Sequence, residues 1–436
     1  MAHTRYQSWI DHCPDDWGIV QLRSLKPQIE YGTNQVSNGH GAGVPVIGIS
    51  QVLSSRFVLS ELPCADVTNQ ERESLALRAH DVLLVRTNGN PSYIGRSTVI
   101  PEGTLDTLTV FASYLIRVRL DQRQMRGAFF NYILQSENGR RQSSALANTS
   151  AGNFNLGARA LSQFTLPLPT PEEQDAIIKA IDAADDQVIA ADEQLRRAER
   201  VKKALLQSVF VEGIPGRGRA PQTFRWGMAP DGWGETSIRS IVTEPVGNGT
   251  SPDAARQEPP GFPTLNVSSI RNGRCDQTKI SYIELPVKAA ADFAVEQGDF
   301  FVLRGNGNRD FVAIGGLLVE EPQTGLVFSD LLIRLRFDKS KTLPEFMKYL
   351  WQSPPFLRRL QSYAVTGSGL WKIGQRSISR QKLAVPPNTG EQKDIAAIFD
   401  AQEELLLSLG TQLTAARRVK QSLLQNLLTG KIRLKP

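Results

Sequence analysis

The feature that most constrains this sequence is an internal duplication. The segment 81–90, DVLLVRTNGN, aligns with the segment 299–308, DFFVLRGNGN, at an offset of 299 − 81 = 218 residues. Two copies of one fold in one chain predict an approximate two-fold axis within the monomer. A partner with its own approximate two-fold symmetry, such as duplex DNA, suits such a molecule. The same shift, within two residues, aligns Pro14–Gly18 with Pro230–Gly234, Glu173-Gln174 with Glu391-Gln392, and Arg200-Val-Lys202 with Arg418-Val-Lys420.

Composition narrows the class of protein. The chain has 436 residues, of which 40% are hydrophobic and 22% charged, which is enough for two to four globular domains. No apolar run approaches the roughly 20 residues of a membrane span, and the first residues lack the apolar core of a signal peptide, so we expect a cytoplasmic protein. The formal net charge of +6 suits an anionic partner, although many proteins without such a partner have a similar excess.

A long helix is predicted at the end of each copy. The stretch from Pro171 to Phe210 contains no internal glycine or proline, and its apolar residues recur at alternating steps of four and three. Such a period, near 3.5, predicts the seam of a coiled coil. If the two-fold axis of the repeat crosses the pair, the two helices run antiparallel. The apolar positions are Ile177, Ile181, Ala184, Val188, Ala191, Leu195, Ala198 and Leu205 in the first copy and Ile395, Phe399, Leu406, Leu409, Leu413, Ala416 and Leu423 in the second.

The remainder of each copy predicts a mixed α/β (α+β) unit of short strands and turns. Strands are expected at 46–49, 82–85 and 115–119, and short helices at 126–135 and 343–352. The predicted boundaries are 1–168 for the first α/β unit, 169–213 for its helix, 214–222 for a glycine- and arginine-rich hinge, 223–385 for the second α/β unit and 386–436 for its helix.

Signals for catalysis are weak. All four histidines lie in the first copy, which excludes a histidine mechanism that belongs to the repeated unit. Neither a phosphate-binding Gly-x-x-x-x-Gly-Lys-Ser/Thr loop nor a strand followed by Gly-x-Gly-x-x-Gly occurs. Ser353-Pro-Pro-Phe356 resembles the motif with which DNA amino-methyltransferases hold their target amino group, but the first copy does not repeat it and no methyl-donor loop accompanies it. We therefore assign it to a helix end.

Two polar clusters occur in both copies. The first is an Asn-Gly turn after a buried strand. A structural hairpin explains this turn as well as DNA binding does, but its arginine and amides can bind phosphates and purine edges. The second is a polar loop at 149–156 and 366–373, for which helix capping is nearly as good an explanation. A nearby pair of arginines in each copy suits phosphate contacts or a solvated helix face equally well. The candidate DNA-binding residues are Arg86, Asn88, Asn90, Arg96, Arg140, Arg141, Ser150, Asn153 and Asn155, and Arg304, Asn306, Asn308, Arg309, Arg358, Arg359, Ser368, Trp371 and Lys372.

The order of these features resembles the specificity subunit of type I restriction-modification systems. The resemblance covers essentially the whole chain: two variable α/β units, each followed by a long helix that begins Pro-x-x-x-Glu-Gln and ends Arg-x-Val-Lys-x-x-Leu-Leu-Gln. It implies two target recognition domains, each of which binds one half of a split DNA sequence, and a helical spacer that also docks two methyltransferase subunits. The helix-start residues Glu173, Gln174, Glu391 and Gln392 are then candidates for this spacer and docking region, together with the apolar positions named above.

The resemblance also implies that the chain itself is not catalytic. S-adenosylmethionine, Mg and ATP would be bound by the partner subunits, which include two methyltransferase subunits and two endonuclease/translocase subunits. Because Asn153-Phe-Asn155 aligns with Leu370-Trp-Lys372, the two halves are expected to bind different sequences. Two other classes stay open: a methyltransferase or restriction enzyme that acts alone, which would bind a methyl donor, and a repeat scaffold that binds no nucleic acid.

Overall fold

The computed structural model of this chain contains two compact units that correspond to the two copies. Unit 1 comprises Met1–Glu193 with Gly410–Pro436, and unit 2 comprises Gln194–Leu409. The structure describes residues 13–35, 41, 43–53, 57, 62–150, 152–217, 219–251, 255–367 and 369–434. None of the helices in these ranges is both long and apolar enough to span a membrane.

The α/β part of unit 1 contains four small sheets. Their strand orders are β1-β12, β4-β3-β8, β2-β9-β5-β7 and β10-β11-β6. The strands are β1 (Gly18–Gln21), β2 (Gln28–Tyr31), β3 (Val44–Ile47), β4 (Cys64–Ala65), β5 (Val82–Val85), β6 (Thr87–Asn88), β7 (Ser97–Val99), β8 (Val110–Phe111), β9 (Leu115–Arg119), β10 (Asn148–Ser150), β11 (Asn153–Asn155) and β12 (Thr165–Leu168). The short helices are η2 (Leu22–Leu25), α2 (Ile49–Leu53), α3 (Asn69–Ser74), η3 (Pro91–Tyr93), α4 (Gly127–Gln135), α5 (Glu137–Leu146) and α6 (Ala158–Leu161).

Unit 2 repeats this arrangement with a larger central sheet of order β16-β26-β22-β24-β20-β19. Its other sheets are β13-β14, β15-β29, β17-β21-β18-β25 and β23-β28-β27. The strands are β13 (Pro221–Phe224), β14 (Gly227–Pro230), β15 (Gly234–Ser237), β16 (Gly247–Asn248), β17 (Ala255–Arg256), β18 (Phe262–Leu265), β19 (Ile270–Arg271), β20 (Gly273–Cys275), β21 (Ile280–Ile283), β22 (Phe300–Leu303), β23 (Gly305–Asn306), β24 (Gly315–Leu317), β25 (Val327–Phe328), β26 (Leu332–Leu335), β27 (Val365–Gly367), β28 (Leu370–Lys372) and β29 (Lys382–Val385). The short helices are η4 (Ile238–Ser240), η5 (Val267–Ser269), α8 (Val287–Asp292), η6 (Arg309–Phe311), α9 (Pro344–Gln352), α10 (Pro354–Ser362) and α11 (Gln375–Ser379).

Most of the predicted short elements are present. The strands β5 and β9 have the predicted bounds, and α4 and α9 begin within one residue of the predicted positions. The strand predicted at 46–49 is shifted, because β3 ends at Ile47 and Ile49 already begins α2. The hydrophobic pattern there could not mark the boundary, since Val46, Ile47 and Val52 all pack into one core.

A buried ion pair anchors the central sheet of each unit. Asp81, at the start of β5, is fully buried, and both of its carboxylate oxygens lie 2.7 Å from the guanidinium group of Arg119 on β9. In unit 2 the carboxylate of Asp299 accepts from Arg336 at 2.7 and 2.9 Å. The duplicated Asp and Arg positions are therefore a structural feature of the repeated unit, which fixes the strand that leads into each Asn-Gly turn.

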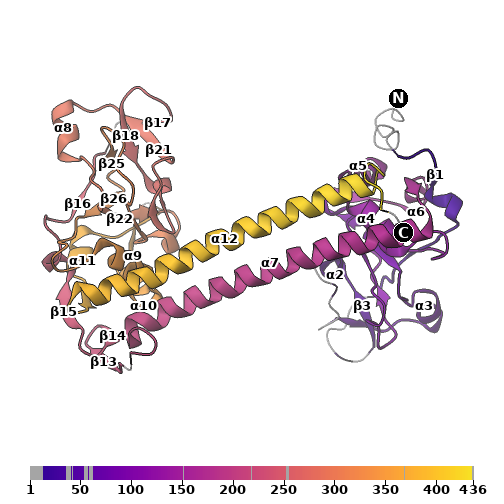
Figure 1. Cartoon of the computed structure of the whole chain (residues 1–436), viewed down its shortest axis with the longest axis horizontal. Coiled ribbons are helices and arrows are strands. Elements are labelled where there is room, and N and C mark those ends of the chain that lie inside the picture. Colours follow the sequence, from indigo (N-terminus) through magenta and orange to yellow (C-terminus); the bar gives the residue numbers. More distant parts are fainter. Residues whose placement is uncertain are drawn as a thin grey trace. The chain divides into compact units, whose positions relative to one another are not determined.

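The two long helices were predicted from the apolar pattern and are present. Helix α7 (Pro171–Glu212) has 42 residues and α12 (Thr389–Leu427) has 39, or about 63 and 58 Å at about 1.5 Å per residue. Figure 1 shows each as one continuous helix. The backbone N–H of Glu173 donates to Thr170 Oγ1, and that of Glu391 donates to Asn388 Oδ1. Gly213 and Gly430 follow the two helices with positive φ.

Within each unit the two helices run in opposite directions. In unit 1, Lys420 pairs with Asp185, and Arg417 lies 3.4 Å from Asp192. Residue numbers thus decrease along α12 as they increase along α7, so the two helices are antiparallel. In unit 2, Lys202 lies 3.0 Å from Glu403. The Lys202–Glu403 pair of unit 2 corresponds to the Lys420–Asp185 pair of unit 1, because 185 + 218 = 403 and 202 + 218 = 420. The helix that carries the lysine in one unit carries the acid in the other. Every predicted apolar position on α7 and α12 is buried or half-buried, as a coiled-coil contact requires.

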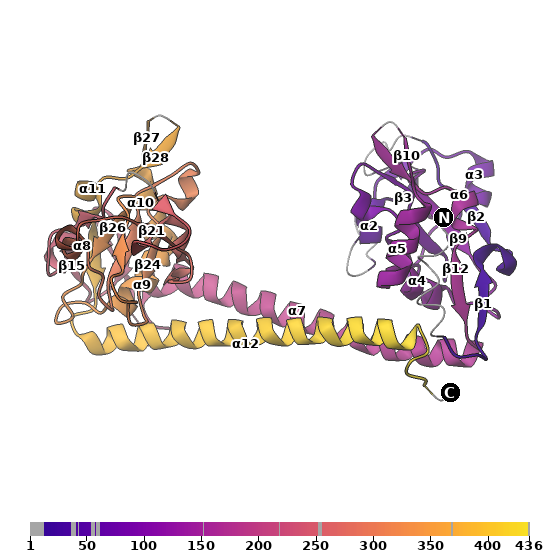
Figure 2. The ribbon, with the colours of Figure 1, turned by 90° about the horizontal axis from the view of Figure 1, so that it is seen from above.

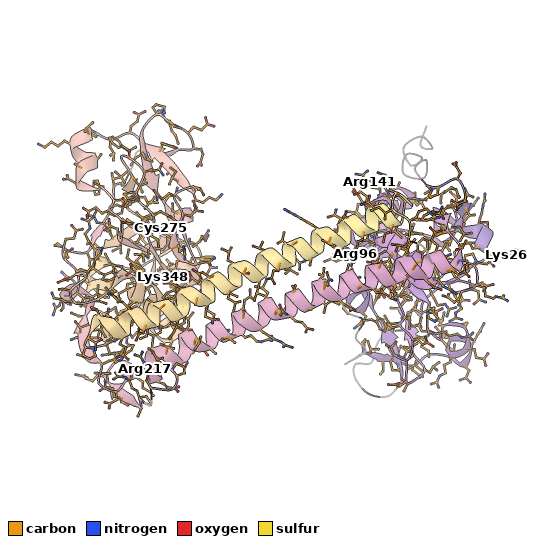
Figure 3. All side chains as sticks on the ribbon, in the orientation of Figure 1. Lys26, Arg96, Arg141, Arg217, Cys275 and Lys348 are labelled. Atoms are coloured by element: carbon orange, nitrogen blue, oxygen red, sulfur yellow. The ribbon has the colours of Figure 1, made fainter. Side chains whose placement is uncertain are left out.

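Unit 2 adds a buried lysine beside the helix pair. The side chain of Lys348, on α9, is 2% exposed, and its Nζ lies 2.8 Å from Glu403 Oε2 and 2.8 Å from Tyr349 Oη (Figure 3). Glu403 also pairs with Arg274 at 3.1 Å. Burial alone would raise the pKa of Glu403, but its hydrogen bonds with Lys348 and Lys202 outweigh burial and lower that pKa to about 2.

The helix-start glutamates are buried inside their own units. Glu173 accepts a hydrogen bond of 2.9 Å from the indole of Trp17 and pairs with Arg433 at 2.9 Å. Glu391 accepts from Trp233 at 3.3 Å and pairs with Arg219 at 2.9 Å. In each unit, an arginine that follows the end of one long helix thus binds the glutamate at the start of the other.

The helix-start glutamines are fully buried as well. Gln174 Oε1 accepts from the backbone N–H of Arg126 at 2.8 Å, and Gln392 Oε1 accepts from that of Leu343 at 2.8 Å. These bonds tie each long helix to the short helix α4 or α9. The side chains of Glu173, Gln174, Glu391 and Gln392 are therefore bonded within the chain, and their assignment to the spacer and docking region stays a prediction.

Candidate nucleic-acid interface

The structure brings the two predicted polar clusters together in each unit. In unit 1 the Asn-Gly turn supplies β6 and the polar loop supplies β10 and β11, which form one three-stranded sheet, here called small sheet 1. In unit 2, β23, β28 and β27 form the equivalent small sheet 2. The registers correspond, since Phe154 faces Asn88 in the first sheet and Trp371 faces Asn306 in the second. Figure 2 shows β10 and the β27–β28 hairpin at the end of their units that lies away from the long helices.

The asparagines of each turn shape the backbone. Asn88 Oδ1 accepts from the N–H of Asn90 at 2.8 Å, and Asn90 Oδ1 accepts from the N–H of Ser92 at 3.0 Å. Asn306 and Asn308 make the same two bonds in unit 2, at 2.9 and 3.0 Å. The amide oxygens are thus used within the turn, while Asn90 and Asn308 are exposed and keep their NH₂ groups at the surface.

Arg86 and Arg304 lie at the base of the turns. Each is half-buried and donates to a backbone carbonyl of its own unit, Arg86 to Ser113 at 3.1 Å and Arg304 to Asp330 at 3.3 Å. The guanidinium group of Arg86 also stacks over the ring of Tyr31 at 4.2 Å. This geometry fits a role in holding the turn better than the phosphate contact predicted for these two arginines.

Exposed arginines flank the small sheets instead. Arg96 is exposed, stacks over Tyr93 at 5.7 Å and donates to the carbonyl of Ser92 at 3.2 Å. Arg309 is exposed and stacks over the indole of Trp371 at 5.1 Å. A guanidinium group held on an aromatic ring is preorganised but keeps donors at the surface, as recognition of phosphates or base edges requires.

The side chains of the two small sheets differ. Asn153 is exposed, and Asn155 Oδ1 accepts from Thr87 Oγ1 at 2.6 Å. In unit 2, Trp371 is half-buried and Lys372 is exposed. The side chain of the candidate Ser150 and the whole of Ser368 lie outside the part of the chain that is described. The two sheets therefore present amides in unit 1 and an indole with a cation in unit 2.

The two arginines of each pair, on α5 and α10, have different environments. Ser136 and Ser353 precede the two helices at an offset of 353 − 136 = 217, so Arg141 corresponds to Arg358, and both are exposed. Arg141 pairs with Glu137 on its own helix and lines a hollow of about 470 Å³ against the end of α12 (Figure 3).

Arg140 and Arg359 instead bind backbone carbonyls. Arg140 donates to Ile94 at 2.7 Å and to Ser92 at 2.6 Å, which supports the first turn. Arg359 donates to Trp226 at 3.0 Å and also to Lys382, so it holds β14 and β29. Burial lowers the pKa of both arginines.

Sequence comparison missed the residue that supports the second turn. Gln361 Nε2 donates to the carbonyls of Asp310 at 2.8 Å and Val312 at 3.2 Å, the counterparts of Ser92 and Ile94. A glutamine in unit 2 thus does what Arg140 does in unit 1. The two residues do not align, so the comparison of the two copies could not identify Gln361.

No catalytic or metal centre emerges within the described ranges. These residues include no group of three or more His, Cys, Asp or Glu side chains that could hold a metal ion. The methyltransferase-like Ser353-Pro-Pro-Phe356 begins α10: Ser353 is the N-cap and Pro354 the first helical residue. Phe356 packs on Trp351 with ring centroids 5.2 Å apart. As predicted, this motif is a helix end.

Comparison with known proteins supports the resemblance inferred from the sequence. The chain is 24% identical over 433 residues to the type I restriction enzyme EcoKI specificity subunit of Escherichia coli (strain K12), covering 96% of this chain and 90% of that one. It is 19% identical over 439 residues to the type I restriction enzyme MjaVIII specificity subunit of Methanocaldococcus jannaschii, with 97% and 94% covered. No protein-family model matches the chain.

Solved structures show the same fold. The S subunit of a type I restriction-modification system from M. genitalium superposes with a TM-score of 0.54 at 12% identity, covering 95% of this chain and 97% of that one. A chain solved in a study of complex assembly and conformational transition of the type I R-M system gives a TM-score of 0.57 at 16% identity, with 96% and 99% covered. These likenesses confirm the predicted fold class, and the relatives' names as specificity subunits agree with the prediction that the chain is not itself an enzyme.

Proposed function

We propose, from the premise that this chain is a homologue of the specificity subunits of type I restriction enzymes, that it selects the DNA sequence on which a multisubunit restriction-modification complex acts. Small sheet 1 and small sheet 2 would each bind one half of a bipartite site. Helices α7 and α12, which both units share, would correspond to the unread spacer between the halves. Methyltransferase and endonuclease subunits would supply the chemistry.

The observation that carries this proposal is the composition of the two small sheets. Each combines an Asx-stabilised turn, a polar hairpin and an arginine that stacks on an aromatic ring. Amide and guanidinium groups can pair with base edges in the major groove, and each bidentate pair contributes about 1–3 kcal/mol of discrimination. A few such contacts in each unit are enough for a useful selectivity.

The difference between the sheets supports an asymmetric site. Asn153 suits an adenine edge, because an exposed amide can donate and accept at once, whereas the Oδ1 of Asn155 already accepts from Thr87. Lys372 and Arg309 carry only donors, which suit the acceptor-rich edge of guanine. One backbone bond beneath these side chains recurs in both units, from Leu156 to Arg86 at 2.9 Å and from Ile373 to Arg304 at 2.8 Å, so we assign the difference between the side chains to recognition.

Mapping of the methylated sequence tests the proposal. The chain is co-expressed with the methyltransferase subunit of a type I system with which it co-purifies, and modified adenines are located by sequencing the host DNA. The variant Lys372→Asn should change the preferred bases in one half of the site only, and Asn153→Ala those in the other half only. Lys279→Asn, an equally exposed lysine of unit 2, is the matched control and should leave both halves unchanged. A change in both halves from one substitution, or in neither half from both, would refute the assignment of one half-site to each unit.

A further inference from the structure

A second group of arginines, outside the small sheets, occurs in both units. In unit 2, Arg239 on η4 and Arg376 and Arg380 around α11 line a hollow of about 530 Å³. In unit 1, Arg23 on η2 and Arg159 on α6 occupy the equivalent positions, since 239 − 23 = 216 and 376 − 159 = 217. All five side chains are exposed.

The fold places these arginines together although about 140 residues separate them in sequence. The backbone N–H of Ile238 donates to the carbonyl of Gln381 at 3.1 Å, which joins η4 to the residue that follows Arg380. In unit 1 the equivalent bond runs from the N–H of Leu22 to the carbonyl of Phe164 at 2.8 Å, and the N–H of Arg23 donates to the carbonyl of Ser162 at 2.9 Å. Each group is therefore built on the same backbone junction.

The guanidinium groups have no internal partner. Within the described ranges, no hydrogen bond, ion pair or aromatic ring engages the side chain of any of the five arginines. The one acid that lines the hollow of unit 2, Glu244, is already paired with Arg334 at 3.2 Å and Arg336 at 3.5 Å. Like charges around one hollow repel each other, so an anion that enters it is bound favourably.

The groups lie next to the small sheets along the chain. Arg376 follows Lys372, the last residue of β28, by four residues, so their Cα atoms are at most about 14 Å apart. That distance corresponds to roughly four base-pair steps of duplex DNA at about 3.4 Å per step. Arg159 follows Asn155, the last residue of β11, by the same four residues.

We propose that Arg239, Arg376 and Arg380 in unit 2, and Arg23 and Arg159 in unit 1, form phosphate clamps that bind the DNA backbone beside each half-site. The clamps rest on the proposed DNA-binding function and extend it, because they supply affinity that is independent of sequence. Arginine suits this role, since its planar fork binds phosphate oxygens bidentately. The third arginine makes the clamp of unit 2 stronger, because Gln163 occupies the position of Arg380 in unit 1.

The salt dependence of binding to a mixed-sequence duplex tests the clamps. Fluorescence anisotropy of the full chain gives the slope of log K against log salt concentration, to which each neutralised phosphate contributes about −0.9. The triple variant Arg239→Gln/Arg376→Gln/Arg380→Gln should flatten the slope by about 2–3, and Arg23→Gln/Arg159→Gln by about 1–2. The control Arg225→Gln/Lys288→Gln/Lys393→Gln removes three exposed charges elsewhere in unit 2 and should change the slope by much less.

The outcomes separate this inference from the function on which it rests. If the unaltered chain fails to bind duplex DNA at any salt concentration, the proposed function itself is refuted. If it binds, and the triple variant keeps both its melting temperature and its slope, only the clamps are refuted. If the triple variant keeps its slope but no longer co-purifies with the methyltransferase subunit, the arginines bind a protein surface, which also overturns the inference. Clamp variants that flatten the slope without changing the methylated sequence support it.

Discussion

The substitution Glu403→Gln should destabilise unit 2 strongly, because Glu403 neutralises a lysine that is almost completely buried. The carboxylate binds Lys348, Lys202 and Arg274, and Gln keeps its size while removing its charge. Lys348 would then keep only Asp400, 3.5 Å away, as an anionic neighbour. An uncompensated buried charge is costly, and loss of one partner of a buried pair typically costs several kcal/mol.

The pKa of Glu403 gives the magnitude. A fall from the ordinary 4.5 to about 2 corresponds to about 3 kcal/mol of preference for the charged form in the folded protein, at about 1.4 kcal/mol per unit. Unit 2 spans 409 − 194 + 1 = 216 residues, and for that size each kcal/mol shifts the melting temperature by about 2–4 °C. Glu403→Gln should therefore lower the melting temperature of unit 2 by about 6–12 °C.

The same pKa fixes the pH dependence. Because the folded-state pKa lies below the ordinary value, the contribution of Glu403 is fully present above about pH 5 and is lost as the pH falls from 4.5 towards 2. Differential scanning calorimetry of the full chain should show a large gap between the parent and the variant at pH 7. That gap should narrow below pH 4.5.

The duplication supplies the control. Asp185 is the counterpart of Glu403 in unit 1, but its side chain is 29% exposed and its cationic partner Lys420 is 24% exposed, so Asp185→Asn should cost no more than about 1 kcal/mol. The double variant Lys348→Met/Glu403→Gln should recover part of the loss, since it removes the unpaired charge. Equal effects of Glu403→Gln and Asp185→Asn, or a double variant that is less stable than Glu403→Gln, would contradict this reasoning.

Three further predictions concern the supports of the fold and the candidate interface. Arg433→Gln leaves the buried Glu173 with only the indole of Trp17, so calorimetry should show a loss of about 1–2 kcal/mol in unit 1, and Arg219→Gln a similar loss in unit 2 at Glu391. Gln361→Leu removes both donors to the second turn, so hydrogen exchange at Phe311 and Val312 should accelerate roughly fivefold for a loss of about 1 kcal/mol, while the first turn, which Arg140 holds, is unaffected. Pro355→Ala, in the methyltransferase-like motif, should leave DNA methylation by the assembled complex unchanged, and a loss of methylation with unchanged melting temperature would restore that motif as a candidate.

The sequence predicted the elements whose pattern is periodic or repeated. The apolar step of four and three residues located α7 and α12, and the offset of 218 residues located β5 and β22 with the turns that follow them. Both signals are local, because a helix or strand is specified by residues that are neighbours in the chain. The pairing of the two helices followed from their apolar stripes, which can cover each other, and the antiparallel direction followed from the two-fold axis of the duplication.

The sequence could not predict which arginines are free. Arg86 follows a predicted strand and Arg140 lies in an arginine pair that suited a solvated helix face, yet each donates to the backbone carbonyl of a residue more than 20 positions away in the sequence. Hydrogen bonds of this kind depend on tertiary contacts. The type of side chain alone does not reveal which distant carbonyl it will contact.

Comparison of the two units distinguishes the backbone bonds that hold each small sheet from the side chains that would contact DNA. The bond from the backbone N–H of Leu156 to the carbonyl of Arg86, 2.9 Å long, recurs between Ile373 and Arg304 at 2.8 Å, so the backbone of each small sheet is fixed in the same way. The side chains at the three preceding positions are nevertheless all different. Two copies of a fold can diverge only where stability does not depend on the side chain, and the exposed faces of the small sheets meet that condition. A bipartite site with unlike halves is therefore what this duplicated chain is best suited to select, because each sheet can change its sequence preference without disturbing the support beneath it.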